Sequence, residues 1–334
     1  MKKRIFITIH YMEIGGAEIS LIGLLNAIDY SQYDVDLFIH SHRGEFMALI
    51  PKEVNLLPED MKYASIEKPM TTVLKQGYVD ILAARLLAKW QSWRFVRRYN
   101  LTNSAAELQY VSENTTPLLR SLEHFGEYDL AISFLAPHTI VRKKIKAKKK
   151  IAWIHTDYTN ISVNAEKELP DWNSYDYIAS ISDDVSRTFC QVFPTLREKL
   201  VLIENILSPT FVRDRSKMGS AEDMPQEKGE YIFLSVGRYS PQKNFDNLPF
   251  IAKSLLDKGV KFKWYIIGYG GDEELIKSKI SEAAVGQTVI LLGKMSNPYP
   301  YMAACDFYIQ PSRYEGKSVT VREAQMLYKP VVVT

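Results

Sequence analysis

Short, strongly apolar runs alternate along the chain with longer stretches in which apolar residues recur every three or four positions. Runs of the first kind are typical of strands buried on both faces of a parallel sheet, and the second spacing is typical of helices that pack on such a sheet. The alternation therefore predicts a series of βαβ units. In the first part of the chain, the expected strands are residues 5–9, 35–39, 130–134, 151–154, 177–181 and 201–206.

The pattern breaks in the segment 207–229 and then starts again. This segment is polar and charged, and its prolines and glycines are typical of a linker. We predict an α/β protein with two Rossmann-like, doubly wound domains, residues 1–206 and 230–334, and a cleft between them. In the second domain, the expected strands are residues 231–236, 262–267, 288–292, 307–310 and 331–333.

The composition excludes several classes of protein. With 334 residues, 46% of them hydrophobic and 24% charged, the chain has the make-up of a soluble globular protein of two domains. The formal net charge of +3 is too small to predict a nucleic-acid partner. Cys190 and Cys305 show no metal or redox spacing, so a cytoplasmic setting is expected. The apolar run 5–9 is interrupted at His10 and lacks a cleavage site, which favours a strand over a signal peptide.

Two segments are rich in cationic residues. In 78–99, Trp90 and Trp93 lie among arginines and lysines, a pattern typical of interfacial helices and equally of core aromatics beside a solvated basic face. In 142–150, seven of nine residues are cationic, which favours either an anionic membrane surface or a solvated helix end. Nucleic acid is a weaker third interpretation, because no recognised binding module accompanies the run. No stretch has the ~20 uninterrupted apolar residues that span a bilayer, so membrane contact would be peripheral.

Three loops that follow expected strands carry residues suited to phosphate binding. The first is Gly15-Gly16-Ala17-Glu18, after strand 5–9. Paired glycines let the backbone approach a ligand, and the helix that follows presents free N–H groups. The spacing differs from G-x-G-x-x-G, so a nicotinamide cofactor is not supported. Taken alone, a glycine pair is more often a simple turn.

The second loop follows the first strand of the second domain. It places Arg238 at the strand end and Lys243 near the start of a helix. Guanidinium and ammonium groups at these positions can converge on one phosphate. Without other signals, two unrelated surface cations would be the better interpretation.

The third loop lies in the segment 311–324. Glu315 ends a strand, Gly316 permits a tight turn, and a helix begins near Ser318, where its N–H groups and dipole suit a diphosphate. Glu323, in the second turn of that helix, can accept hydrogen bonds from vicinal hydroxyls, as acidic residues do for ribose in other nucleotide folds.

Together these motifs resemble those of glycosyltransferase family four. Glu315 and Glu323 form an E-x7-E element, the segment 237–244 is similar to the family's diphosphate-binding loop, and Gly15-Gly16-Ala17-Glu18 is similar to its N-terminal glycine loop. The three motifs occur in the family's order, and the resemblance covers nearly the whole chain. It implies a retaining glycosyltransferase of the GT-B fold, of the hexosyltransferase type, with a UDP- or GDP-linked sugar as donor.

The resemblance also implies roles for individual residues of the second domain. Arg238 and Lys243 would hold the donor diphosphate and stabilise the charge that develops as the sugar leaves. Glu323 would bind the ribose hydroxyls, and Glu315 would contact sugar hydroxyls near the reacting carbon. Backbone donors to the phosphates would come from Gly316, Lys317 and Ser318.

In the first domain, the resemblance implies that Gly15 and Gly16 approach the diphosphate from across the cleft. His155 is similar to the family's histidine at a strand end near the transferred sugar, so it joins Glu315, Arg238 and Lys243 as a catalytic candidate. Asp183 and Asp184 follow a serine where a helix begins, and capping explains them. No metal and no cofactor beyond the nucleotide-sugar substrate is expected.

The chain departs from the family pattern in two ways. After Glu315-Gly316 it has Lys317-Ser318, where the family has an apolar residue and then glycine or proline, so the sugar cannot be inferred. It also stops at Thr334, where family members continue through further helices, so the chain is interpreted as C-terminally truncated.

The acceptor is expected to be a saccharide. The basic segments motivate the hypothesis that it is lipid-linked, at the cytoplasmic face of the cell membrane, as in surface or capsular polysaccharide synthesis. Three alternatives stay open at this point. A sugar-nucleotide epimerase would turn over donor without an acceptor, an inactive nucleotide-binding or scaffold protein would transfer nothing, and a nicotinamide oxidoreductase is disfavoured by the missing glycine fingerprint.

Overall fold

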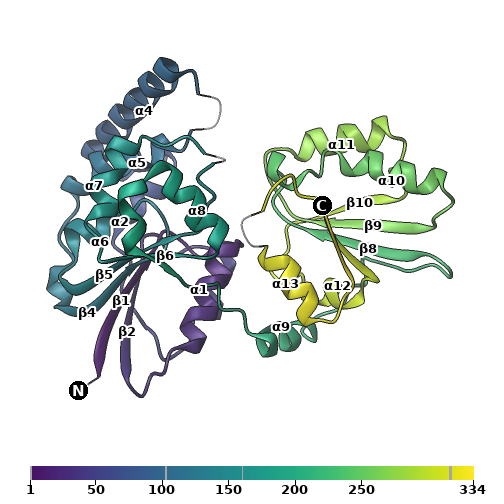
Figure 1. Cartoon of the computed structure of the whole chain (residues 1–334), viewed down its shortest axis with the longest axis horizontal. Helices are drawn as coiled ribbons and strands as arrows, with labels where there is room; N and C mark the ends of the chain where they lie inside the picture. Colours follow the sequence, from purple (N-terminus) through teal and green to yellow (C-terminus); the bar gives the residue numbers. More distant parts are fainter. Residues whose placement is uncertain (1, 102–103, 160, 316–317) are drawn as a thin grey trace. The chain divides into compact units, whose positions relative to one another are not determined.

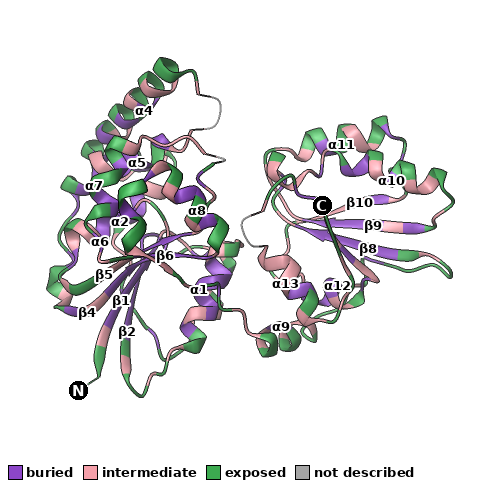
Figure 2. Cartoon of the chain, in the orientation of Figure 1, coloured by how far each residue is buried: buried purple, intermediate pink, exposed green. Residues whose placement is uncertain are grey.

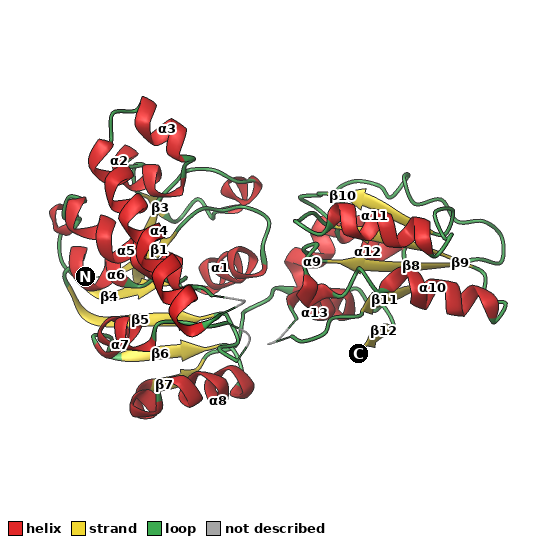
Figure 3. Ribbon diagram, turned by 90° about the horizontal axis from the view of Figure 1, so that it is seen from above, coloured by secondary structure: helices red, strands yellow, loops and turns green. Residues whose placement is uncertain are grey.

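The structure is a computed structural model that describes residues 2–101, 104–159, 161–315 and 318–334. The chain forms two compact units, residues 1–206 and 207–334 (Figure 1). Each unit is built on a parallel β-sheet with helices on both of its faces (Figure 3). The α/β class and the doubly wound, Rossmann-like pattern predicted from the sequence are therefore confirmed.

In the described part of the N-terminal unit, seven parallel strands form one sheet in the order β3-β2-β1-β4-β5-β6-β7. Phe6, Ile7 and Ile9 of the central strand β1 are at most 1% exposed, which explains why the sequence shows this strand as an apolar run. The strands are β1 (Lys3–Ile9), β2 (Tyr33–Ile39), β3 (Asn55–Leu56), β4 (Tyr128–Ser133), β5 (Ala147–Ile154), β6 (Tyr177–Ser180) and β7 (Leu200–Leu202).

The helices of the N-terminal unit connect these strands, and four of them, among them the 21-residue α4, lie between β3 and β4. The α-helices are α1 (Gly16–Ala27), α2 (Met61–Ala64), α3 (Met70–Lys75), α4 (Val79–Tyr99), α5 (Ala106–Thr115), α6 (Thr139–Lys144), α7 (Ala165–Asn173) and α8 (Asp183–Val192). Short 3₁₀ turns are η1 (Glu45–Leu49), η2 (Ser65–Glu67), η3 (Thr116–Leu118), η4 (Glu123–Phe125) and η5 (Pro194–Lys199).

In the described part of the C-terminal unit, five parallel strands form a sheet in the order β10-β9-β8-β11-β12. The strands are β8 (Tyr231–Val236), β9 (Phe262–Ile267), β10 (Val289–Gly293), β11 (Phe307–Gln310) and β12 (Val331–Val333). The helices are α9 (Pro209–Ser216), α10 (Leu248–Asp257), α11 (Glu273–Glu282), α12 (Tyr299–Ala304) and α13 (Val319–Met326), with the 3₁₀ turn η6 (Pro241–Lys243).

Alternate side chains of β8 enter two hydrophobic cores, one on each face of the C-terminal sheet. Ile232, Leu234 and Val236 pack with residues of α9, α12 and α13. Phe233 packs on the other face with residues of α10 and α11. In Figure 1 these two groups of helices lie on opposite sides of the sheet. Burial on both faces is why the strand reads as an uninterrupted apolar run.

The structure differs from the sequence pattern at several boundaries. The last strand of the N-terminal unit ends at Leu202, so residues 203–206 extend beyond it. The segment 207–229 contains α9, whose Val212 is buried in a core of the C-terminal unit. Strand β3 was not predicted, because a strand of two residues leaves no periodic pattern.

The basic run 142–150 joins a helix to a strand rather than forming a solvated helix end. Helix α6 ends at Lys144 and β5 begins at Ala147. Nζ of Lys150 donates to the carbonyls of Val141, Arg142 and Ile145 at 2.8 to 3.1 Å, and so satisfies the end of α6. Four ion pairs compensate further cations of the run: Arg142–Asp171, Lys146–Glu127, Lys148–Asp129 and Lys149–Asp176.

Candidate functional site

The strand order of the C-terminal sheet locates a candidate ligand site. In doubly wound sheets, ligands bind beyond the carboxyl ends of the strands where the order reverses, because the two following connections leave to opposite faces. Here this point lies between β8 and β11, since β8 leads to α10 on one face and β11 leads to α13 on the other. The loops that follow these strands are the ones that carry Lys243 and Glu315.

Lys243 and Glu315 meet at this point although they are 72 residues apart in the chain. Nζ of Lys243 donates a hydrogen bond to Oε1 of Glu315, and the side chains are 17% and 25% exposed. The Lys243 side chain packs closely over Gly237, where a Cβ would lie 3.3 Å from three of its carbons. The lysine therefore lies across the glycine and points its charge at the carboxylate.

A chain of polar side chains along β11 holds Glu315 in place. Ser312 Oγ donates to Oε1 of Glu315 at 2.6 Å, and Nε2 of Gln310 donates to Ser312 Oγ at 2.7 Å. Oε1 of Gln310 in turn accepts from the hydroxyl of Tyr308 at 2.7 Å and from Oγ1 of Thr320 at 3.2 Å. These bonds orient the carboxylate and connect it to the first turn of α13.

Two other expected ligands of the diphosphate lie beside this pair in sequence. Arg238 is exposed, and among the residues that the structure describes no hydrogen-bond or ion-pair partner is found for its guanidinium. Ser318 is the N-cap of α13, where its Oγ accepts from the backbone N–H of Val321 at 3.4 Å. Gly316 and Lys317 lie outside the described residues.

Glu323 is buried inside the C-terminal unit. The residue is 4% exposed, and its carboxylate accepts a hydrogen bond from the hydroxyl of Tyr299 at 2.7 Å. Burial raises the pKa of Glu323 to about 7, against the smaller opposing effect of the Tyr299 bond. Burying a carboxyl group that ionises near neutral pH lowers stability. Residues with such perturbed pKa values are frequent at functional sites.

In the N-terminal unit, the strand order reverses between β1 and β4, and Gly15 and Gly16 follow β1. Gly15 is the N-cap of α1 and has an extended backbone conformation. A Cβ on Gly15 would lie 2.2 Å from Oε2 of Glu18, so only glycine lets this buried carboxylate reach the start of the helix. The N-terminus of α1 thus faces a carboxylate of the chain itself.

His155 follows β5 at the same edge of the N-terminal sheet. Its ring lies 4.7 Å from that of Phe134, centroid to centroid, and its Nε2 is buried with no partner among the described residues. Burial lowers the pKa of His155 to about 4, so the imidazole is neutral at neutral pH. A neutral ring with a free nitrogen can donate or accept one hydrogen bond to a ligand.

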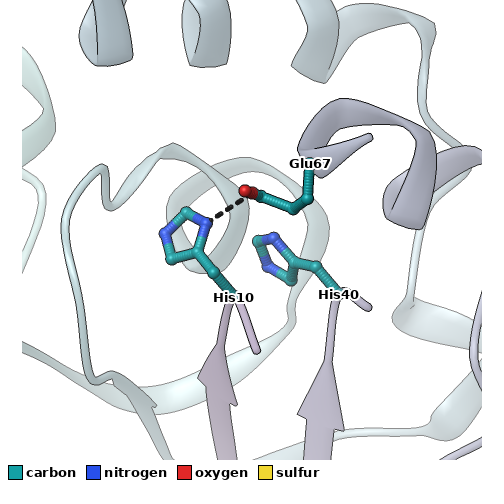
Figure 4. A group of neighbouring side chains, drawn as sticks. All are labelled: His10, His40 and Glu67. Carbon is teal, nitrogen blue, oxygen red and sulfur yellow. Dashed lines mark hydrogen bonds and ion pairs between the residues drawn. The ribbon is translucent and has the colours of Figure 1, made fainter. Parts of the chain in front are cut away.

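A cluster of His10, His40 and Glu67 was not found in the sequence (Figure 4). His10 and His40 directly follow β1 and β2, and Glu67 comes from the turn η2. Nδ1 of His10 bonds to Oε1 of Glu67 at 2.7 Å, whereas both ring nitrogens of His40 are buried without a partner among the described residues. One ligand atom from each residue lies within 4.8 Å of the others, so the cluster could hold a metal ion.

The charges of this cluster are coupled. Burial disfavours the charged form of both His10 and Glu67, but the attraction between them and their hydrogen bond outweigh it. The pKa of His10 is therefore raised, and that of Glu67 falls to about 2. Burial, reinforced by His10, lowers the pKa of His40 to about 3. The sequence contains one signal for this cluster: each histidine directly follows an apolar strand, and the ends of adjacent parallel strands lie close together. Glu67, 57 residues from His10, could not be found that way.

Comparison with known proteins identifies the C-terminal unit. Residues 220–334 match the protein family described as "Glycosyl transferases group 1". An uncharacterized glycosyltransferase of Haemophilus influenzae is 22% identical over 99% of this chain and 80% of its own length. A second relative is 33% identical over 32% of this chain and 28% of its own: the N-acetylgalactosamine-N,N'-diacetylbacillosaminyl-diphospho-undecaprenol 4-alpha-N-acetylgalactosaminyltransferase of Campylobacter jejuni.

Among solved structures, the chain is similar to Anabaena Alr3699/HepE, crystallised in complex with UDP and glucose. The TM-score is 0.62 at 16% identity, over 99% of this chain and 80% of the Anabaena chain. At that identity the likeness establishes the fold. The chain therefore has the GT-B type of α/β fold, carries a glycosyl transferases group 1 domain at residues 220–334, and has glycosyltransferases as relatives.

Proposed function

We propose that this chain is a retaining glycosyltransferase that moves a hexose from a UDP- or GDP-linked donor to a saccharide acceptor. The observation that carries the proposal is the convergence of Lys243 and Glu315 at the switch point of the sheet, within the group 1 domain. A cation and a fixed carboxylate side by side suit a ligand that is a diphosphate at one end and a polyhydroxylated sugar at the other.

In this proposal, binding of the donor replaces the contact between Lys243 and Glu315. When a diphosphate binds, Lys243 turns its ammonium from Glu315 to the phosphate oxygens, where the exposed Arg238 also contacts them. Glu315, still held by Ser312, is then free to accept hydrogen bonds from sugar hydroxyls. The N-terminus of α13, capped by Ser318, contributes N–H donors and a favourable dipole.

Bond breaking is assisted electrostatically. As the sugar leaves, negative charge grows on the diphosphate, and the Arg238 and Lys243 side chains stabilise it in place of a metal ion. In a retaining reaction the acceptor hydroxyl attacks on the face that the diphosphate leaves, and a phosphate oxygen takes its proton. Glu323 binds the ribose hydroxyls, for which Tyr299 holds its carboxylate in one orientation.

The N-terminal unit contributes to the sugar and acceptor side. His155 offers an unpaired nitrogen on a neutral ring to a hydroxyl of the sugar, and Gly15 and Gly16 allow the donor to come close to the backbone. The acceptor is a lipid-linked saccharide used in surface or capsular polysaccharide synthesis, and the protein works peripherally at the inner face of the membrane. The Campylobacter relative, named for a diphospho-undecaprenol-linked acceptor, supports this choice. No helix in the described part of the chain is both long and apolar enough to cross a bilayer.

Binding of nucleotides tests the donor site. Calorimetric titration with UDP, GDP and their hexose conjugates should show one base preferred, and Lys243→Ala should weaken binding of that nucleotide by about 10- to 100-fold, the effect of one or two charged hydrogen bonds. Lys253→Ala is the matched control, because Lys253 pairs with Asp257 on the surface of α10 in the same unit. Equal losses in both variants would contradict the site.

Product analysis separates the alternatives. The preferred donor, incubated with and without lipid-linked saccharide, should transfer its sugar only when the acceptor is present. Conversion of donor to an isomeric nucleotide sugar without acceptor would identify an epimerase. Nucleotide binding without any turnover would identify an inactive binding protein.

A further inference from the structure

Helix α4 has an inner face that accounts for its place in the N-terminal unit. Ile81, Ala84, Ala88 and Ser92 are buried, and their spacing of three or four residues puts them on one side of the helix. Ala88 packs there with Ala106 and other residues of α5. A helix on the surface of a domain needs only one such apolar face to pack on the core.

The opposite side of α4 is also apolar, although it faces away from the unit. Val79, Leu86, Trp90 and Trp93 are 60%, 52%, 51% and 54% exposed. At 100° per residue they fall within a sector of about 60° centred opposite the buried face. Exposed residues cover α4 along most of its length (Figure 2). A contiguous outward apolar stripe with two tryptophans is unusual for a solvated helix and marks an interaction surface.

Cations follow this stripe toward the end of the helix. The guanidinium of Arg94 lies over the ring of Trp90 at 4.8 Å, and that of Arg97 over the ring of Trp93 at 5.2 Å. Arg98 is exposed next to them. The helix has a single acidic residue, Asp80, which lies at its other end and pairs with Lys62. The surface is therefore apolar in the middle and positively charged at its C-terminal end.

We propose that the outward face of α4, with Leu86, Trp90 and Trp93 at its centre and Arg94, Arg97 and Arg98 beside them, docks on an anionic lipid bilayer. Tryptophans prefer the headgroup level, arginines bind lipid phosphates, and a helix of 21 residues lying flat offers about 31 Å of contact. The charge complementarity favours a lipid surface over an acidic or apolar protein partner, since two arginines lie directly over the two tryptophan rings of this face.

The basic run 142–150 is not part of this surface. Four of its cations pair with acidic partners, and Lys150 binds the carbonyls at the end of α6. The arginines at the end of α4 have aromatic rings beneath them and no such carboxylates in the ion pairs found among the described residues. Of the two basic segments noted in the sequence, α4 is therefore the better candidate for binding lipid.

As a route to a lipid-linked acceptor, this inference rests on the proposed function, but docking itself can be measured without any transfer reaction. The full chain is incubated with vesicles of phosphatidylcholine alone or mixed with phosphatidylglycerol, which is anionic, and bound protein is sedimented. Wild type should bind the anionic vesicles, less strongly at high salt. Trp90→Ser with Trp93→Ser, and Arg94, Arg97 and Arg98 each →Gln, should each lower the partition coefficient at least about tenfold.

The matched control neutralises the other basic segment. Lys146, Lys148 and Lys149 each →Gln removes the same number of charges from 142–150 and should leave vesicle binding unchanged. Tryptophan emission gives a second readout, because Trp153, Trp172 and Trp264 are at most 4% exposed, so a vesicle-induced blue shift reports on the two tryptophans of α4. Unchanged thermal melting and nucleotide binding show that the variants are folded.

Several results would overturn the proposal. Wild type could fail to bind anionic vesicles at low salt, or the lysine control could lose binding as much as the arginine variant. Lipid-free dimerisation that the tryptophan variant abolishes would assign the face to a second copy of the chain. Vesicle binding without any sugar transfer would contradict the proposed function and leave the docking surface standing.

Discussion

Replacing Glu323 by glutamine should stabilise the C-terminal unit while weakening nucleotide binding. Glu323 is 4% exposed, and burial raises the pKa of its carboxyl to about 7 from an ordinary value of 4.5. The folded state therefore holds the proton more tightly than the unfolded state does. Stability from this group is present below pH 4.5 and is lost as the pH rises through 7.

The size of the effect follows from these two pKa values. Between pH 5 and pH 8, the ionising carboxyl lowers the free energy of unfolding by about 2 to 3 kcal/mol. Glutamine does not ionise. Like the protonated acid, it has an oxygen that can accept from the Tyr299 hydroxyl and a group that can donate. The variant should thus match wild type near pH 5 and exceed it by about 2 to 3 kcal/mol at pH 8.

Urea unfolding at both pH values, followed by hydrogen exchange of peptides from β8 and α13, would measure this difference in the C-terminal unit. The matched control is Glu168→Gln, because burial also raises the pKa of Glu168 to about 7, but in the N-terminal unit. Its gain should appear in peptides of β5 and α7 only. If Glu323→Gln and wild type lose stability equally from pH 5 to pH 8, the buried, protonated state of this carboxyl is refuted. Undiminished nucleotide affinity in the variant would remove the ribose assignment.

Three further predictions address other parts of the chain. Lys243→Met should slow sugar transfer at saturating donor by at least about 100-fold, because the negative charge on the diphosphate in the transition state loses a cation. Single-turnover kinetics would measure this loss, and unchanged rates would remove the catalytic role. Glu67→Gln should lower the pKa of His10 in an NMR titration, since the carboxylate that raises it is gone, and the stability that the pair contributes below pH 6.5 should disappear from urea melts. Lys150→Met should destabilise the N-terminal unit by about 2 kcal/mol in chemical unfolding, because three carbonyls lose their donor, whereas Lys148→Met, which breaks an exposed ion pair, should cost under about 1 kcal/mol.

The sequence predicted the central strands of the C-terminal unit closely, because β8 and β9 are buried on both faces along most of their length. The expected runs 231–236, 262–267 and 307–310 have the bounds of β8, β9 and β11. The prediction was weaker where strands carry charge. Strand β5 begins at Ala147, inside the basic run, since Lys148 and Lys149 are paired to carboxylates of neighbouring strands and connections. No local pattern signals such partners.

In the candidate site, too, the sequence predicted the residues but not their contacts. The residue types of the donor site, such as Lys243, Glu315 and Glu323, were chosen from their spacing and from a family resemblance, and their roles stay predictions. That Lys243 contacts Glu315, while Glu323 contacts Tyr299 in the core, depends on the order of the strands. The cluster of His10, His40 and Glu67 was missed for this reason.

By itself, then, the sequence determined the α/β class, the two-unit organisation and the loops that follow the strands, because hydrophobic periodicity reports which side of each element is buried. Tertiary structure decided which charges are compensated. It joined Lys243 to Glu315 across 72 residues, satisfied the run 142–150 internally, and left Trp90 and Trp93 of α4 facing outward. Charge and exposure depend on neighbours brought together by folding, and these lie far apart in the chain.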